Sequence, residues 1–92
     1  MNIETLRAEI DRVDDEIAAL LARRMAISVL VALEKVNTGA PVYHPEREAA
    51  IMERLYEKTE PHWQPALKMI YDTIFDTSRQ FQEGIVGGGE AA

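Results

Sequence analysis

Two cationic side chains lie on one stripe of a mostly apolar segment, LLARRMAISVLVALEK, residues 20–35. Arg24, Ser28, Val31 and Lys35 are spaced i, i+4, i+7 and i+11, so on an α-helix they share one face. The two cations would lie about 16 Å apart along the axis, and two long side chains reaching toward each other could bind a small anion between them. Alternatively, Arg24 extends to the surface and Lys35 is a solvated residue that the helix dipole favours.

A second segment repeats this spacing near the carboxyl end of the sequence. Tyr71, Phe75, Ser78 and Gln82 are also placed at i, i+4, i+7 and i+11, so two neutral hydrogen-bonding groups continue an apolar face. Such groups could orient a polar ligand that the cations attract. They could also be the polar end of an ordinary helix.

Three further charged residues are candidates for the same chemistry. Arg47 and Glu48 are adjacent; on a helix they face different directions, and a surface charge pair is the alternative. Arg7 precedes Arg24 by about 25 Å of straight helix and is turned about 100° away. It could join Arg24 only from a second chain whose long helix runs antiparallel, and otherwise it is an exposed residue of a first turn.

The element that must position Arg24 and Lys35 is one long helix. Apolar residues alternate at gaps of 3 and 4 from Ile3 to Val31, with Arg24 in the series, and no Gly or Pro interrupts residues 3–38. This is the seam of a helix packed on other helices. The helix would be about 50 Å long, whereas a compact chain of this size has a radius of gyration of about 12 Å. We therefore expect a second copy to pack along it.

Two shorter helices complete the predicted all-α fold of three helices per chain. Gly39 and Pro41 end the first helix, and Pro45 starts a second with an apolar face at Ala49, Ile51, Met52 and Leu55. A proline-containing connector, residues 59–65, precedes a third helix from about residue 65 or 66 to Glu83. Its inward residues are expected to be Leu67, Ile70, Tyr71, Ile74, Phe75 and Phe81. We predict a domain over residues 1–84 and a flexible Gly-rich tail over residues 85–92.

Composition restricts the classes of partner. The chain has 92 residues, no cysteine, and 16 acidic against 10 basic residues, for a net charge of −6. A general nucleic-acid or anionic-membrane binder needs a basic surface, so we expect neither partner. No stretch approaches membrane-spanning length and none resembles a targeting segment. We expect a soluble, cytoplasmic domain in which a local cluster of cations binds any anionic ligand.

Taken in order, several segments resemble one enzyme family. LRAEIDRVDDEIAALLARR, Lys35, GAPVYHPEREAAIMERL and IFDTSRQFQ are similar to the all-helical class of chorismate mutases, over residues 3 to about 83. LRxxID alone is a weak motif, but the ordered set is specific. The resemblance implies an intertwined homodimer with two equivalent sites that converts chorismate to prephenate, the committed step toward phenylalanine and tyrosine. It implies no cofactor and no metal.

The resemblance also implies roles for individual residues. Arg24 and Lys35 would bind the side-chain carboxylate of chorismate, and Lys35 would also reach the ether oxygen. Arg7 from the partner chain, together with Ser78, would bind the ring carboxylate. Gln82 would donate to the ether oxygen, so the catalytic residues would be Lys35, Gln82 and Arg24.

The remaining implied residues complete the pocket. Glu48 would accept a hydrogen bond from the ring hydroxyl of the substrate, and Arg47 would support the polar network. His44 stands where several family members have an aspartate, so it is either a second contact to the hydroxyl or only the start of the second helix. The positions that would line the pocket with apolar surface are Val31, Ile51 and Phe75.

Two other functions remain open at this point. An isochorismate pyruvate lyase of the same fold would act on a similar dianion, although the PVYHPERE connector favours the mutase. A non-catalytic dimerisation or regulatory module would use seam charges to fix helix register.

Overall fold

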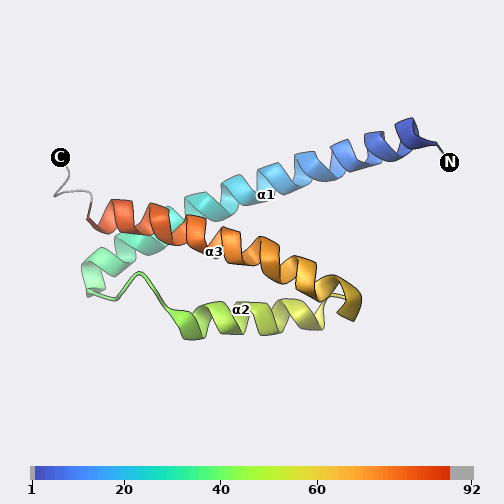
Figure 1. Cartoon of the computed structure of the whole chain (residues 1–92). Helices are drawn as coiled ribbons and strands as arrows, with labels where there is room; N and C mark the ends of the chain where they lie inside the picture. Colours follow the sequence, from blue (N-terminus) through green and yellow to red (C-terminus); the bar gives the residue numbers. More distant parts are fainter. Residues whose placement is uncertain (1, 88–92) are drawn as a thin grey trace.

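The computed structural model describes residues 2–87, and these form three α-helices and one short 3₁₀-helix. Helix α1 spans Ile3–Thr38, α2 spans Pro45–Glu57, the 3₁₀-helix η1 spans Pro61–Trp63, and α3 spans Gln64–Val86. In Figure 1, α3 crosses α1 and α2 lies on the other side of α3's amino-terminal half. Residues 2–87 contain no strand, which confirms the predicted all-α class.

The ends of α1 follow from local sequence. At the amino end, the Asn2 side chain accepts a hydrogen bond of 2.9 Å from the Thr5 N–H, a standard N-cap. At the carboxyl end, Gly39 has φ +73° and its N–H donates to the Lys35 carbonyl at 2.8 Å. This left-handed cap favours glycine. It places Lys35 in the last turn of α1, beside the connector to α2.

Helix α2 begins at Pro45, as the sequence predicted, because His44 caps it. The imidazole Nδ1 of His44 accepts a hydrogen bond of 3.1 Å from the Arg47 N–H, which satisfies a backbone donor that the helix leaves open. The acidic residues Glu46 and Glu48 occupy the first turn, where the helix dipole favours negative charge. Glu48 is thereby fixed at the end of α2 nearest the connector.

Helix α3 is longer than the sequence suggested. It continues past Glu83 to Val86 and ends at Gly87, whose N–H donates to the Glu83 carbonyl at 2.9 Å. Gly84 lies inside the helix; one glycine costs only about 1 kcal/mol there and does not end it. Residues 85 and 86 of the predicted tail are therefore helical, and residues 88–92 lie outside the described residues.

The core of the single chain is small. Ile51, Met52 and Phe75 form its buried centre, with Leu55, Tyr56, Leu67 and Tyr71 packed around them. Helix α1 contributes Ser28 and Ala32, whose small side chains allow α3 to approach closely. Ile70 and Phe81 were expected to face inward but are exposed, and so is Ala49. The reason is that three helices of this length leave one side of α3 and of α2 uncovered.

The amino-terminal half of α1 extends beyond the other helices (Figure 1). Every residue from Asn2 to Leu20 is exposed. The radius of gyration is 16.6 Å, well above the roughly 12 Å of a compact chain of this length. Within the described residues, no helix combines the length and the apolar character needed to cross a membrane.

Candidate active site

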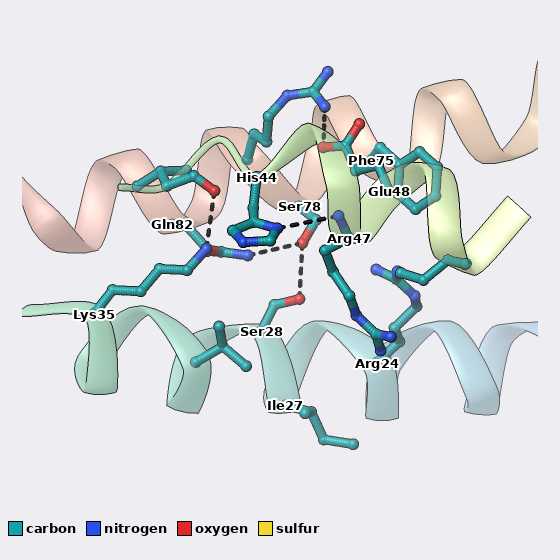
Figure 2. Close-up of a pocket in the computed structure, with 14 residues that line it drawn as sticks. Arg24, Ile27, Ser28, Lys35, His44, Arg47, Glu48, Phe75, Ser78 and Gln82 are labelled. Atoms are coloured by element: carbon teal, nitrogen blue, oxygen red, sulfur yellow. Dashed lines mark hydrogen bonds and ion pairs between the residues drawn. The ribbon is translucent and has the colours of Figure 1, made fainter. Parts of the chain in front are cut away.

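A cavity of about 260 Å³ lies where α1, the connector, α2 and α3 meet. Ten residues singled out from the sequence line it: Arg24, Val31, Lys35, His44, Arg47, Glu48, Ile51, Phe75, Ser78 and Gln82. Figure 2 shows Arg24 and Arg47 at one end, and Lys35 and Gln82 at the other. Residues that are up to 58 positions apart in sequence are thus brought to one pocket.

The pocket is positively charged within an acidic chain. Four cationic side chains and one carboxylate line it, which gives a formal charge of +3 with His44 neutral, against −6 for the whole chain. Clefts lined by charges of one sign concentrate the field and attract ligands of the opposite sign. The site therefore suits a small anion.

A chain of hydrogen bonds joins α1 to α3 across the floor of this pocket. Lys35 Nζ donates to Gln82 Oε1 at 2.8 Å and to the Val42 carbonyl at 2.9 Å. Gln82 Nε2 donates to Ser78 Oγ at 3.3 Å, and Ser78 Oγ lies 2.8 Å from Ser28 Oγ. This network holds Lys35 and Gln82 side by side.

The network still leaves donor capacity toward the cavity. An ammonium group has three N–H donors and an amide has two; two of the three on Lys35 and one of the two on Gln82 are used in these bonds. Each residue therefore retains one N–H for a ligand. Both could reach the same acceptor atom, because the two groups are already in contact.

At the other end of the pocket, Arg24 is held by aromatic rings. Its guanidinium carbon lies 6.0 Å from the Tyr71 ring centre and 5.8 Å from that of Phe75, within the range of cation–π attraction. Arg24 is half-buried, so part of its donor fork faces the cavity. Ile51 and Phe75 are buried and, with Val31, provide the apolar wall.

The chain does not bring Arg7 to this pocket. Arg7 is exposed on the extended half of α1 and is not among the residues that line the cavity. The sequence spacing had indicated this separation within one chain. Any contribution from Arg7 must come from a second chain.

Sequence reasoning missed Arg79, which lines the pocket on α3. Arg79 Nη1 donates to Glu48 Oε2, and this hydrogen bond raises the pKa of the guanidinium above its usual value. A signal was present: Arg79 is four residues after Phe75 and three before Gln82, so it shares their face. The three other lining residues that were not predicted to bind a ligand are Ile27, Ser28 and Val42.

Residues 6–83 match the family described as chorismate mutase type II. The chain belongs to this family. Among solved structures, a Helicobacter pylori chorismate mutase in complex with prephenate superposes with a TM-score of 0.81 and 39% identity, covering 91% of this chain and 92% of that one. The resemblance to the all-helical chorismate mutases is thereby confirmed.

Curated relatives agree with this membership. The bifunctional chorismate mutase/prephenate dehydratase of Aquifex aeolicus is 31% identical over 88 residues, which is 90% of this chain and 24% of the relative. The intracellular chorismate mutase of Mycobacterium tuberculosis is 40% identical over 55 residues, 60% of this chain and 52% of the relative. The chain thus spans between about a quarter and a half of the length of these chorismate mutase relatives.

Proposed function

We propose that the chain converts chorismate to prephenate, in the biosynthesis of phenylalanine and tyrosine. The observation that carries this proposal is the contact between Lys35 and Gln82 inside a cationic pocket, in a chain of the chorismate mutase type II family. The reaction is a rearrangement within one molecule: one C–C bond forms as the ether C–O bond breaks. It therefore requires no nucleophile, and the protein contributes conformation and electrostatics.

The first contribution is to hold the flexible dianion with its enolpyruvyl arm over the ring, an effect of proximity and orientation. In our proposal Arg24 and Lys35 reach toward each other from opposite ends of the pocket and bind the side-chain carboxylate between them. Ser78 and a partner's copy of Arg7 bind the ring carboxylate. Charge-assisted hydrogen bonds to carboxylates are among the strongest in proteins, so two such clamps can fix the reactive conformer.

The second contribution is directed at the ether oxygen, where negative charge builds as the C–O bond breaks. Lys35 and Gln82 each retain one N–H toward the cavity, as their existing bonds imply. Donors placed in advance stabilise the transition state more than the ground state, because the charge that they bind is not yet present in the substrate. Their mutual hydrogen bond means that little reorganisation is needed.

The remaining polar residues would orient the ring. Glu48 would accept a hydrogen bond from the ring hydroxyl. Arg47, at the Arg24 end of the pocket, would support the polar network. His44 caps α2 through Nδ1, which accounts for this residue without a ligand. We therefore propose that His44 serves as the N-cap of α2. Any contact between His44 and the substrate hydroxyl would use its Nε2.

We also propose that the active form is an intertwined homodimer. The support is the extended half of α1, where Ile3, Ile10 and Leu20 are exposed on one seam, together with the distance of Arg7 from its own chain's pocket. A partner with an antiparallel α1 would cover the seam and bring its Arg7 toward the pocket. We place this dimer in the cytoplasm, as the intracellular relative from M. tuberculosis suggests.

The test is to follow the loss of chorismate absorbance with purified protein and to identify prephenate as the product. Lys35→Ala should lower kcat/KM by about 10²–10³-fold or more, the usual loss for a donor aimed at developing charge. Lys58→Ala, which removes an exposed lysine outside the pocket, is the matched control and should leave the rate unchanged. Parental turnover in Lys35→Ala would contradict the site.

The same assay separates the competing functions. Supplied with isochorismate, a pyruvate lyase would release salicylate and pyruvate, whereas the proposed mutase would act on chorismate in preference. An intact dimer that consumes neither compound would be a non-catalytic module. Either result would overturn the proposed function.

A further inference from the structure

Arg79 contacts three parts of the chain from one wall of the pocket. Its Nη1 donates to Glu48 Oε2 on α2, and its Nη2 lies 3.8 Å from Asp76 Oδ1 on its own helix. Its guanidinium carbon also lies 5.2 Å from the centre of the Tyr43 ring in the connector. Arg79 therefore links α3 to the start of α2 and to the connector that covers the pocket.

Glu48 is the only carboxylate among the described residues that line this pocket. Its side chain is 24% exposed and that of Arg79 is 26% exposed, so the pair is partly shielded from water. A carboxylate can accept hydrogen bonds at both oxygens. Oε2 is occupied by Arg79, and the hydrogen bonds of the described residues leave Oε1 available to a ligand.

Without Arg79, Glu48 would have other cations to bind. Arg24, Lys35 and Arg47 line the same pocket, and a glutamate side chain can rotate about three bonds. A Glu48 carboxylate that turned toward them would neutralise groups needed for an anionic ligand. The pair with Arg79 holds the negative charge of Glu48 against α3 instead.

We infer that Arg79 is a positioning residue that fixes Glu48 so that its free oxygen meets the hydroxyl of the substrate. This inference rests on the proposed function, in which Glu48 accepts the ring hydroxyl of chorismate. Arg79 acts through Glu48 and does not itself bind the substrate. Its effect should therefore depend on two things: the presence of Glu48 and the presence of the hydroxyl.

The experiment compares chorismate with an analogue in which hydrogen replaces the ring hydroxyl. The quantity measured is the ratio of the two kcat/KM values, because a general loss of folded protein lowers both rates equally and leaves the ratio unchanged. In Arg79→Met the ratio should fall about tenfold, the typical effect of losing a hydrogen bond to a charged group. Glu48→Gln should lower it similarly, and adding Arg79→Met to Glu48→Gln should change it no further.

Two more variants control for helix stability and for charge. Lys68→Met breaks the Lys68–Asp72 ion pair on the same helix, outside this pocket, and should leave the ratio at the parental value. Arg79→Lys keeps a cationic donor and the fold. Its ratio of kcat/KM for chorismate to that for the analogue should therefore stay higher than the ratio of Arg79→Met. A lysine variant that discriminates no better than the methionine variant would overturn the inference.

The outcomes separate the inference from the proposed function. If the parental chain turns over chorismate but the ratio in Arg79→Met equals the parental ratio, the positioning role is wrong and the function stands. If Arg79→Met lowers the ratio equally with and without Glu48, Arg79 acts directly on the substrate, which also overturns the inference. A parental chain with no turnover of chorismate would overturn both.

Discussion

The two halves of α1 share one periodic pattern but differ in what covers them. From Ile3 to Leu20 the seam is apolar and every residue is exposed, with Ile10 at 57%. From Arg24 to Lys35 the helix packs on α3 through Ser28 and Ala32, and the two cations at its ends face a pocket. The seam alone therefore does not determine burial within a chain.

The difference between the halves comes from the residues beside the seam. Ser28 and Ala32 are small enough for α3 to pack closely, and this contact turns Arg24 and Lys35 toward the space between the helices. Within residues 2–87, no other helix lies beside the amino-terminal half (Figure 1). One half of α1 lines the pocket, and in our proposal the other half forms the interface that completes the site.

The largest expected effect is on this interface. Ile10→Glu places a charge on the seam in both copies of a dimer. Each copy then loses the free energy of burying one isoleucine side chain, about 1.5–3 kcal/mol. The dissociation constant should rise about 10²–10⁴-fold, measured by sedimentation equilibrium. Ala8→Glu adds the same charge about 160° around the helix from Ile10, so the dimer of this variant should dissociate far less. Equal dissociation by both variants would show that the seam is not the interface.

Substitutions at the two arginines test whether the halves of α1 meet in one site. Arg7→Ala and Arg24→Ala should each lower kcat/KM by about 10²–10³-fold, because each removes a proposed carboxylate ligand. If each site combines Arg24 of one chain with Arg7 of the other, refolding the two variants together forms dimers with one intact site. Activity should then recover to about a quarter of the parental value.

Failure to recover would have a clear meaning. Refolded single variants, treated identically, are the control for damage during refolding. A mixture that stays as inactive as its components, although mixed dimers are present, would place Arg7 and Arg24 in the same chain's site or remove Arg7 from the site. Either result would break the proposed division of α1 into a site half and an interface half.

Much of this arrangement could be predicted from the sequence because it depends on local rules. Gly39 and Pro45 fix the ends of α1 and α2 through backbone conformation, and the i, i+4, i+7, i+11 spacing places Arg24 and Lys35 on one face. The exposure of Ile70 and Phe81 could not be predicted, since spacing shows that a face is apolar but not which element covers it. Arg79 was missed because its partner Glu48 is 31 positions away.

A smaller effect concerns the pH dependence of the site half. The proposed donors to the ether oxygen are Lys35 and the amide of Gln82, and an amide does not titrate. We expect kcat/KM to change less than about threefold between pH 6 and 8. Gln82→Glu should lose up to about a hundredfold over this range, because only the protonated carboxyl can donate and its fraction falls about tenfold per pH unit above an ordinary glutamate pKa. The measurement is a pH profile of kcat/KM for both proteins.

The folding stability of the chain should not change enough between pH 6 and 8 to affect that pH profile. The pKa values of Arg79 and Lys68 are raised by hydrogen bonds to Glu48 and Asp72 respectively. A cation with a raised folded-state pKa stabilises the fold at every pH below its unfolded value, and this contribution is lost only as the pH rises through the folded value. Both lie far above pH 8. A loss of parental activity at neutral pH would therefore contradict the assignment of Gln82.

The smallest expected effect is at the contact that makes the site half of α1 different. Ser28, 7% exposed, bonds Ser78 at 2.8 Å, and Ser28→Ala removes this bond while keeping the close approach of α3. The free energy of unfolding should fall by about 0.5–1.5 kcal/mol, measured by urea denaturation. Thr73→Ala, on the exposed face of α3, is the control. Because Ser78 accepts a hydrogen bond from Gln82 in the same network, Ser28→Ala should lower kcat/KM by only a few-fold. A loss as large as that of Lys35→Ala would mean that the serine pair itself contacts the reacting atoms.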